Sequence, residues 1–161
     1  MEFNLRDSPT LKVKSMDWSF DKDLDPQKLE RDMIDFMIEN KGIGLAANQI
    51  GLDKRIFVIG LDSSSSKAYF NPIIIESSEQ TIEDIEGCLS YPDLWLKIKR
   101  PEWIVVGYYD SNNSFHEERF TGMLSKCFQH ELDHLDGICF VDKVSKLKLQ
   151  LAMKKQRKLN K

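Results

Sequence analysis

The segment Gln129 to Gly137, QHELDHLDG, carries the residues best suited to chemistry. It contains the pattern H-E-x-x-H, with His130 and His134 four residues apart and Glu131 between them. On an α-helix, side chains four residues apart lie on one face, so both imidazoles can bind one metal ion. Glu131 can then act as a general base beside that metal. The alternative is a surface helix whose histidines pair with neighbouring acids.

A catalytic metal usually has three protein ligands, so the two histidines require a third. A third histidine ligand at the spacing found in metzincin proteases is excluded, because Phe140 occupies that position. A glutamate ligand from a later helix, as in thermolysin-like proteases, is also excluded, because Asp142 is the only acidic residue after Gly137. His116 remains a candidate, although it lies in a polar run of a predicted strand. Cys88, within EGCLS, is the better candidate because thiolates bind such metals well; the alternative is a buried structural thiol.

The segment GIGLAANQIG, residues 42–51, is a candidate for substrate binding. Its glycines allow the backbone to approach a ligand closely. Gln49 carries a donor and an acceptor that can address a substrate carbonyl. The alternative is a helix end that leads into a tight turn, with Gln49 exposed.

The whole chain has the composition of one globular domain. Its 161 residues are 41 % hydrophobic and 30 % charged. The net charge of −3 argues against a general nucleic-acid binder, and we expect no specific DNA binding. No apolar run approaches the ~20 residues of a membrane span, so no membrane association is expected. Three cysteines without a secretion signal indicate free or metal-bound thiols, and we expect a cytoplasmic protein.

The hydrophobic periodicity predicts an α+β fold, with mostly antiparallel strands packed around the H-E-x-x-H helix. A helix of about fourteen residues is expected from Pro26, ending before Gly42. The central helix is expected from Gly122 to about Asp136. Pro72 marks an edge strand or a bulge. Strands are predicted at residues 55–61, 68–75, 79–85, 94–99, 102–109 and 115–121.

Residues 143–161 form a basic C-terminal helix and tail. From Lys143 onward there are eight Lys or Arg and no acids. An apolar stripe of Val144, Leu147 and Leu151 predicts a helix that docks on the body. The charge of the last eight residues favours a polyanionic partner, such as a nucleoprotein particle.

Three segments together resemble the signature of the peptide deformylase family. With Φ for an apolar residue, the family motifs are G-Φ-G-Φ-A-A-x-Q, E-G-C-Φ-S and Q-H-E-Φ-D-H-Φ-x-G. The chain contains GIGLAANQ, EGCLS and QHELDHLDG in that order, and every defined position matches. The resemblance extends over most of residues 1–161, which we expect to form a single catalytic domain. It implies hydrolysis of the N-formyl group from formyl-methionine on newly made peptides, with release of formate.

The resemblance also assigns roles residue by residue. Glu131 would be the general base, while Gln49 and the Leu89 N–H would stabilise the oxyanion. Gln129 and Asp133 would support the ligands. The metal would be bound by Cys88, His130 and His134. Ile43 and Gly44 would border the substrate, and Glu86 would support a ligand. We also expect substrate contacts from Glu86, Tyr91 and Trp95, although Tyr91 and Trp95 are not residues of the family pattern.

Two positions depart from the usual family pattern. Tyr91 follows EGCLS where the family often has Val or Ile, and Trp95 stands where some members carry arginine. Both would make the mouth of the substrate site more aromatic. Arg100 lies where the family often has arginine.

The resemblance implies one divalent metal, with Fe²⁺ expected and Zn²⁺, Ni²⁺ or Co²⁺ able to substitute. The ligands alone would suggest Zn²⁺ first. The implied partners are formylated nascent peptides and, through the basic tail, the ribosome; we expect a monomer. The rival hypotheses are a metalloprotease of another class and a non-catalytic ribosome-binding protein. The presence of Cys88, Gln49 and Glu131 argues against the second.

Overall fold

The computed structural model describes residues 3, 5 and 9–159. Parts of the N-terminal segment and of the predicted basic tail, at residues 1–2, 4, 6–8 and 160–161, lie outside the described residues. The α-helices are α1 (Pro26–Glu39), α2 (Gly122–Leu135) and α3 (Lys146–Leu159). The strands are β1 (Gly44–Ala46), β2 (Ile56–Ile59), β3 (Lys67–Ser77), β4 (Thr81–Cys88), β5 (Tyr91–Pro101), β6 (Trp103–Tyr109) and β7 (Phe115–Thr121). As far as these residues extend, none of the helices is long and apolar enough to cross a membrane.

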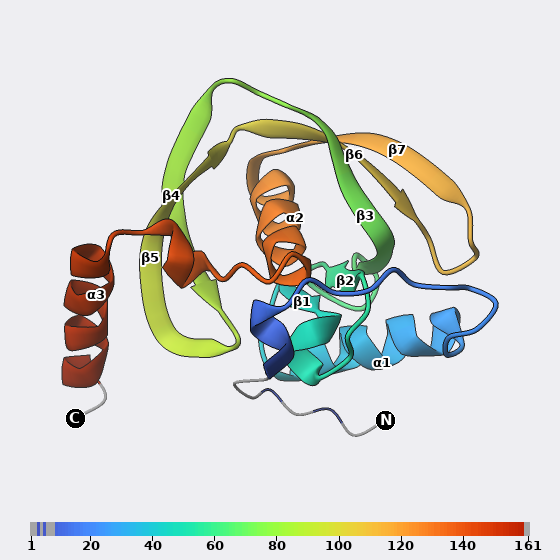
Figure 1. Cartoon of the computed structure of the whole chain (residues 1–161), viewed down its shortest axis with the longest axis horizontal. Helices are drawn as coiled ribbons and strands as arrows, with labels where there is room; N and C mark the ends of the chain where they lie inside the picture. The colour runs from blue at the N-terminus through green and yellow to red at the C-terminus, as the bar shows by residue number, and fades with distance from the viewer. Residues whose placement is uncertain (1–2, 4, 6–8, 160–161) are drawn as a thin grey trace.

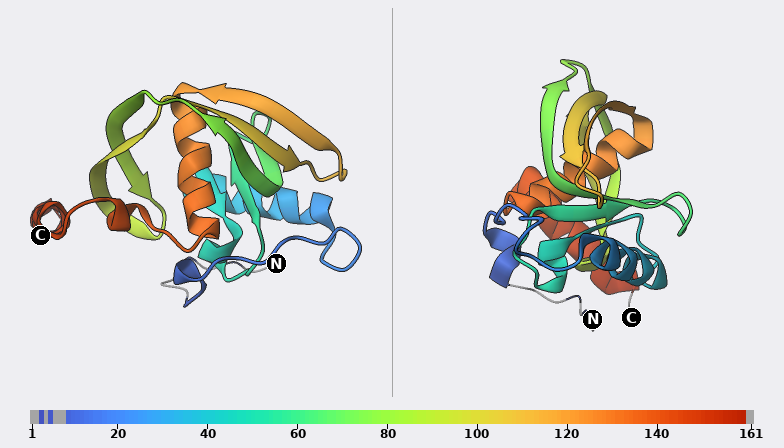
Figure 2. Two further views of the ribbon diagram at one scale, coloured as in Figure 1. Left: turned by 45° about the horizontal axis from the view of Figure 1, so that its top comes forward. Right: turned by 90° about the vertical axis from the view of Figure 1, so that its right-hand side faces the viewer.

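Helix α2 lies at the centre, with antiparallel sheets around it (Figures 1 and 2). Within the described residues, one sheet has five strands in the order β1-β2-β3-β6-β7, and the other pairs β4 with β5. All pairings between these strands are antiparallel. Helix α1 packs against β1, β2 and β3, and α3 stands beside β5. The predicted α+β fold around the central helix is confirmed.

Buried side chains cover both faces of the larger sheet. The Phe128 ring of α2 lies 4.9 Å from that of Phe57 on β2 and 5.3 Å from that of Tyr69 on β3. Edge-to-face ring pairs like these contribute about 0.5–1.5 kcal/mol each beyond burial. On the other face, Met33 and Met37 of α1 are fully buried. This packing fixes the position of α2, the helix that carries the H-E-x-x-H motif.

The predicted strands agree with the structure. One observed strand, β1, was not predicted, and the structure decides between the edge strand and the bulge expected at Pro72. Each predicted strand overlaps one of β2 to β7, whereas no strand was predicted at β1, which lies in the glycine-containing segment 42–51. Pro72 marks a bulge and not an edge, because β3 lies between β2 and β6 and its register shifts between Phe70 and Ile73. At this bulge Asn71 has a φ of 47°, and its side chain bonds the backbone N–H and carbonyl of Trp18.

Helix α3 docks through a different stripe from the predicted one. Leu147 and Leu151 are 66 % and 59 % exposed, so their predicted contact with the body is wrong. Leu149 and Ala152 pack instead, together with Val144, beside the buried side chains of β5. Leucines recur at every second residue here, and a helix cannot place all of them on one face. The sequence pattern therefore does not determine which face of α3 packs against the body.

Candidate metal centre

Helix α2 presents His130 and His134 on one face, one turn apart. Both side chains are buried, with exposed fractions of 8 % and 1 %. The helix ends at Leu135 and Gly137 follows with a φ of 74°, which glycine adopts with little strain. A Cβ at Gly137 would lie 2.9 Å from the carbonyl carbon of Lys12, so the N-terminal arm packs closely on this helix end. The predicted extent of the helix is confirmed.

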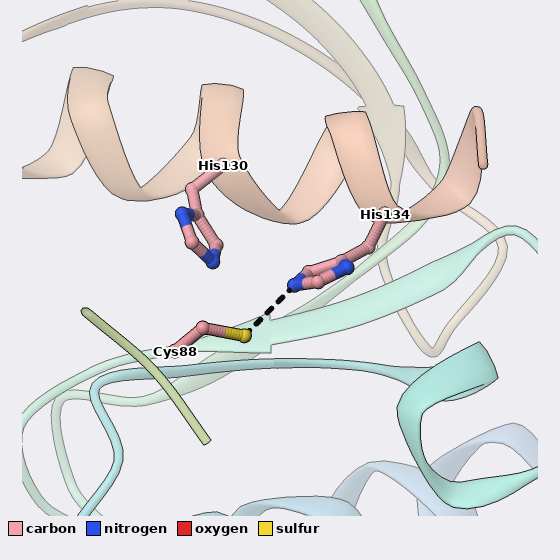
Figure 3. Close-up of side chains that lie close together, drawn as sticks. All are labelled: Cys88, His130 and His134. Atoms are coloured by element: carbon pink, nitrogen blue, oxygen red, sulfur yellow. Dashed lines mark hydrogen bonds between the residues drawn. The ribbon is translucent and has the colours of Figure 1, made fainter. Parts of the chain in front are cut away.

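The third donor comes from the hairpin between β4 and β5. Cys88 is the last residue of β4, and its Sγ lies 3.2 Å from Nε2 of His134. One ligand atom from each of Cys88, His130 and His134 lies within 4.8 Å of the other two, and Figure 3 shows their side chains converging. The structure thus brings the three predicted ligands together. His116, the weaker candidate, pairs with Asp110 and stacks on Tyr108 instead.

The donors and their surroundings suit a divalent cation. One thiolate and two imidazole nitrogens are common ligands of zinc and related metals, which leave further positions for water or substrate. Glu86 lies 2.9 Å from Nδ1 of His130, as the carboxylate partner of a metal-binding histidine usually does. Burial alone would lower the pKa of His130, but hydrogen bonds with Cys88 and Glu86 outweigh it and raise the pKa to about 10. Burial, together with the positive charges of His130 and Arg100, lowers the pKa of the second histidine, His134.

A buried arginine holds these supports in place. Arg100 donates to both oxygens of Glu86, at 2.5 and 2.9 Å, and to Asp133 at 2.8 Å. Burial alone would raise the pKa of Glu86, but hydrogen bonds from His130 and Arg100 lower it to about 2. Both carboxylate oxygens of Glu86 are thus engaged, as expected of a residue that supports a ligand, while its contact with substrate stays a prediction.

Glu131 is a buried carboxyl group with an unused oxygen. It is 4 % exposed, and its Oε2 has no hydrogen-bond partner among the described residues. Burial raises its pKa to about 7. Gly44 makes room for it, because a Cβ at Gly44 would lie 2.3 Å from Oε1 of Glu131. Such a group, one residue after a ligand, is suited to proton transfer.

The side chain of Gln49 is buried and oriented by bonds at both ends, which excludes the exposed alternative. Its Oε1 accepts from the Ala46 N–H at 2.8 Å. Its Nε2 lies 3.4 Å from Sγ of Cys88 and 3.0 Å from Oγ of Ser90. Leu89 follows Cys88 at the tip of the hairpin between β4 and β5. Gln49 and Leu89, the two residues expected to stabilise an oxyanion, therefore both lie beside the Cys88 thiol.

A cavity of about 640 Å³ opens over this centre, within the range of ~300–1,000 Å³ typical of ligand sites. Trp95 is 64 % exposed at its wall, and its ring lies so close to Gly87 that an added Cβ would come within 2.8 Å. The lining includes most of the predicted site residues, namely Ile43, Gly44, Gln49, Glu86, Cys88, Leu89, Tyr91, Trp95, His130 and Glu131.

Comparison with known proteins decides the family. A family model described as polypeptide deformylase matches residues 2–150. The chain belongs to the polypeptide deformylase family. A peptide deformylase from Zymomonas mobilis is 43 % identical over 151 residues, which cover 87 % of this chain and 84 % of that relative.

Solved deformylase structures share the fold over nearly the whole chain. The crystal structure of a peptide deformylase from Synechococcus elongatus, in complex with actinonin, gives a TM-score of 0.88 at 34 % identity, covering 96 % of this chain and 88 % of that one. A peptide deformylase from Legionella pneumophila gives a TM-score of 0.85 at 34 % identity, covering 98 % and 96 %. The Cys-His-His group thus lies in a deformylase fold.

Some contacts of this deformylase site were not predicted from the sequence. Ser90 accepts a hydrogen bond from Gln49, and its place in EGCLS is a signal that could have suggested such a role. Lys143 lies 3.0 Å from Asp133, and nothing in the local sequence indicates this pair. Gln129, expected to support a ligand, donates instead to the Pro101 carbonyl and to Ser125.

Proposed function

We propose that this deformylase removes the N-formyl group of formyl-methionyl peptides at the Cys88, His130 and His134 centre, with Glu131 carrying the proton. The position of Glu131 carries the proposal: a buried carboxyl group with an unused oxygen lines the same cavity as Cys88 and His130. The reaction adds water across the formyl C–N bond. The water oxygen joins the formyl carbon to give formate, and a proton goes to the nitrogen that leaves as the free amine.

Cys88, His130 and His134 would hold the metal. When bound, a divalent metal supplies Lewis acidity, which lowers the pKa of a water molecule and polarises the formyl oxygen. We propose Fe²⁺ on the strength of the family resemblance; the same donors would also accept Zn²⁺, Ni²⁺ or Co²⁺. Metal analysis of protein purified without oxygen checks this choice, and zinc as the sole metal would contradict it.

Glu131 would move the proton in both halves of the reaction. Its Oε2 would accept a proton from the attacking water and later return it to the leaving nitrogen. Burial raises the pKa of this carboxyl to about 7, and a base with a pKa near the working pH both accepts and releases a proton readily. Gly44 contributes by leaving space for the carboxyl group.

Gln49 and the backbone N–H of Leu89 would stabilise the negative charge that develops on the formyl oxygen. The bond from Ala46 to Oε1 fixes the Gln49 amide, so that its Nε2 faces Cys88 and Ser90. Donors that are already oriented require no rearrangement as charge develops, and loss of one donor typically costs about 10²–10³ in kcat.

The substrate backbone would run along Ile43 and Gly44, which line the cavity beside Glu131. Tyr91 and Trp95 form an aromatic part of the lining. We propose that Trp95 contacts the residues that follow the formyl-methionine, because its ring is the more exposed of the two.

Replacement of Trp95 by alanine tests this contact. We expect kcat/KM for peptides with a large apolar residue after methionine to fall about two- to tenfold relative to peptides with glycine there, the size of one aromatic contact. The matched control is Trp103→Ala, which removes an indole from β6 in the other sheet. Equal turnover of both peptides by wild type and Trp95→Ala would remove Trp95 from the substrate site.

The basic helix α3 is a candidate contact for ribosomes that carry nascent formylated chains in the cytoplasm. Among the residues of this helix whose exposure is described, Leu149, Ala152 and Gln156 are half-buried and face the body. The cations of its second half remain exposed: Lys154, Lys155, Arg157 and Lys158. An open cationic face of this kind suits a polyanionic surface.

Removal of residues 154–161, or replacement of the four exposed cations by glutamine, should weaken co-sedimentation with ribosomes, most clearly at low salt. The control replaces four other exposed cations by glutamine. These are Lys14 and Lys22 before α1, and Lys28 and Arg31 within it. Unchanged ribosome binding at low salt by the truncated chain would eliminate the tail as a contact.

Substrate choice separates the proposed reaction from that of a metalloprotease of another class. The metal-loaded protein should release formate from formyl-Met-Ala-Ser and leave unformylated Met-Ala-Ser and casein intact. Cleavage of internal peptide bonds in casein would support the protease instead. Metal-bound protein with no turnover on any of these substrates would favour the non-catalytic alternative.

A further inference from the structure

We propose that Asn48 is a positioning residue that fixes the metal ligand His134 through its backbone. The inference rests on the proposed metal centre and goes beyond it. Histidines that bind metals usually donate their second ring N–H to an acceptor, which fixes the orientation of the ring. His130 has this partner in Glu86. For His134, the buried Nδ1 has no hydrogen-bond partner within the described part of the chain. Its position therefore depends on its backbone and packing.

Asn48 supplies a tie to that backbone. It is fully buried in the short 3₁₀ helix Ala47–Ile50, and its Nδ2 donates a hydrogen bond to the carbonyl of His134, 86 residues away in the sequence. The same carbonyl accepts the Gly137 N–H at 3.0 Å, but that bond lies within the end of α2 itself. The bond from Asn48 instead anchors the peptide of the ligand to a different element.

The next residue reaches a second ligand. Gln49 Nε2 lies 3.4 Å from Sγ of Cys88, so the dipeptide Asn48–Gln49 contacts two of the three ligands, which come from α2 and β4. Asn48 occupies the undefined position x of the motif G-Φ-G-Φ-A-A-x-Q, to which the family pattern assigns no residue. Its amide therefore connects the segment that carries Gln49 to the helix that carries His134.

Arg55 offers a matched comparison at the same helix end. Its Nη1 donates to the Leu135 carbonyl at 3.2 Å and to Asp136 at 2.7 Å, and it is 8 % exposed. Arg55 thus stabilises the last turn of α2 from a buried position. It does so through the carbonyl of Leu135, and not through that of the ligand His134. Loss of Arg55 weakens the helix end without releasing the carbonyl of the ligand.

Co²⁺ titration of the metal-free protein, followed by absorbance, tests the proposal. Asn48→Leu removes the donor and keeps the branched shape of the side chain, although leucine is larger, and Asn48→Ala removes the donor without overfilling the site should the leucine variant not fold. Residues that orient ligands typically account for about 10- to 100-fold in metal affinity, and we expect a weakening of this size in both variants. Arg55→Met should lower the thermal unfolding temperature of the metal-free protein while Co²⁺ affinity stays within about threefold of wild type.

Three results are distinguishable. Wild-type Co²⁺ affinity in the Asn48 variants would overturn the proposal. An equal loss of affinity in Arg55→Met would also overturn it, because general weakening of the helix end would then explain the effect. Absence of Co²⁺ binding by the wild-type chain would refute the metal centre on which the inference depends, whatever Asn48 does.

Discussion

In the variant Glu131→Gln, formate release from formyl-Met-Ala-Ser falls about a thousandfold, within the range of ~10²–10⁴ expected for loss of a general base. Glutamine has the size of glutamate, so it fits the space that Gly44 leaves open. It cannot accept a proton from water, and therefore the proton transfer that begins the reaction is lost. The three ligands are unchanged, so the protein keeps its metal.

Metal content and kcat/KM must be measured on the same preparation of this variant. The control is Glu117→Gln, which makes the same chemical change at an exposed position on β7 and should leave activity at the wild-type level. Activity within tenfold of wild type in a fully metal-loaded Glu131→Gln would show that another group carries the proton.

Replacement of Arg100 by methionine has the largest expected effect on stability. The Arg100 side chain is 4 % exposed, and it pairs with Glu86 and Asp133, whose side chains are 9 % and 17 % exposed. Removal of one member of a buried ion pair leaves the other charge uncompensated, which typically costs about 3–5 kcal/mol. We expect ~3 kcal/mol here, because His130 still contacts Glu86 and Lys143 still contacts Asp133.

Denaturant unfolding of the metal-free protein measures this loss of stability. The control is Lys28→Met, which breaks the exposed contact of Lys28 with Asp32 on α1; exposed pairs are worth about 0–1 kcal/mol. Because Arg100 also orients Glu86 against His130, metal affinity should fall about 10- to 100-fold. An Arg100→Met protein as stable as Lys28→Met would show that the buried network contributes little.

The chemistry of this site can be predicted because it lies in short segments with fixed spacing. Two histidines four apart share a helix face in any α-helix, and the structure places them accordingly. Cys88 was the better of two candidates for the third ligand, and the family resemblance assigned it, although no local rule states that β4 ends beside α2. Strands β2 and β3 could be predicted for a similar reason, since their runs of β-branched and aromatic residues reflect local preference.

What the sequence did not reveal depends on contacts between distant segments. Lys143 reaches Asp133, and Asn48 reaches the carbonyl of His134, only because the fold brings these residues together. Helix α3 shows the same limit: its periodicity permits several docking faces, and the shape of the β5 surface selects Leu149 over Leu147. The engagement of both Glu86 oxygens by Arg100 was likewise not revealed, because it joins side chains of β4 and β5.

The most direct test of metal-dependent deformylation measures formate release before and after removal of the metal. Protein purified without oxygen is assayed on formyl-Met-Ala-Ser, then treated with a chelator and assayed again, then reloaded with Fe²⁺ or Ni²⁺. We predict that formate release disappears with the metal and returns on reloading, while Cys88→Ser, which weakens the ligand set, recovers little activity. Undiminished formate release from protein shown to be free of metal would contradict the account.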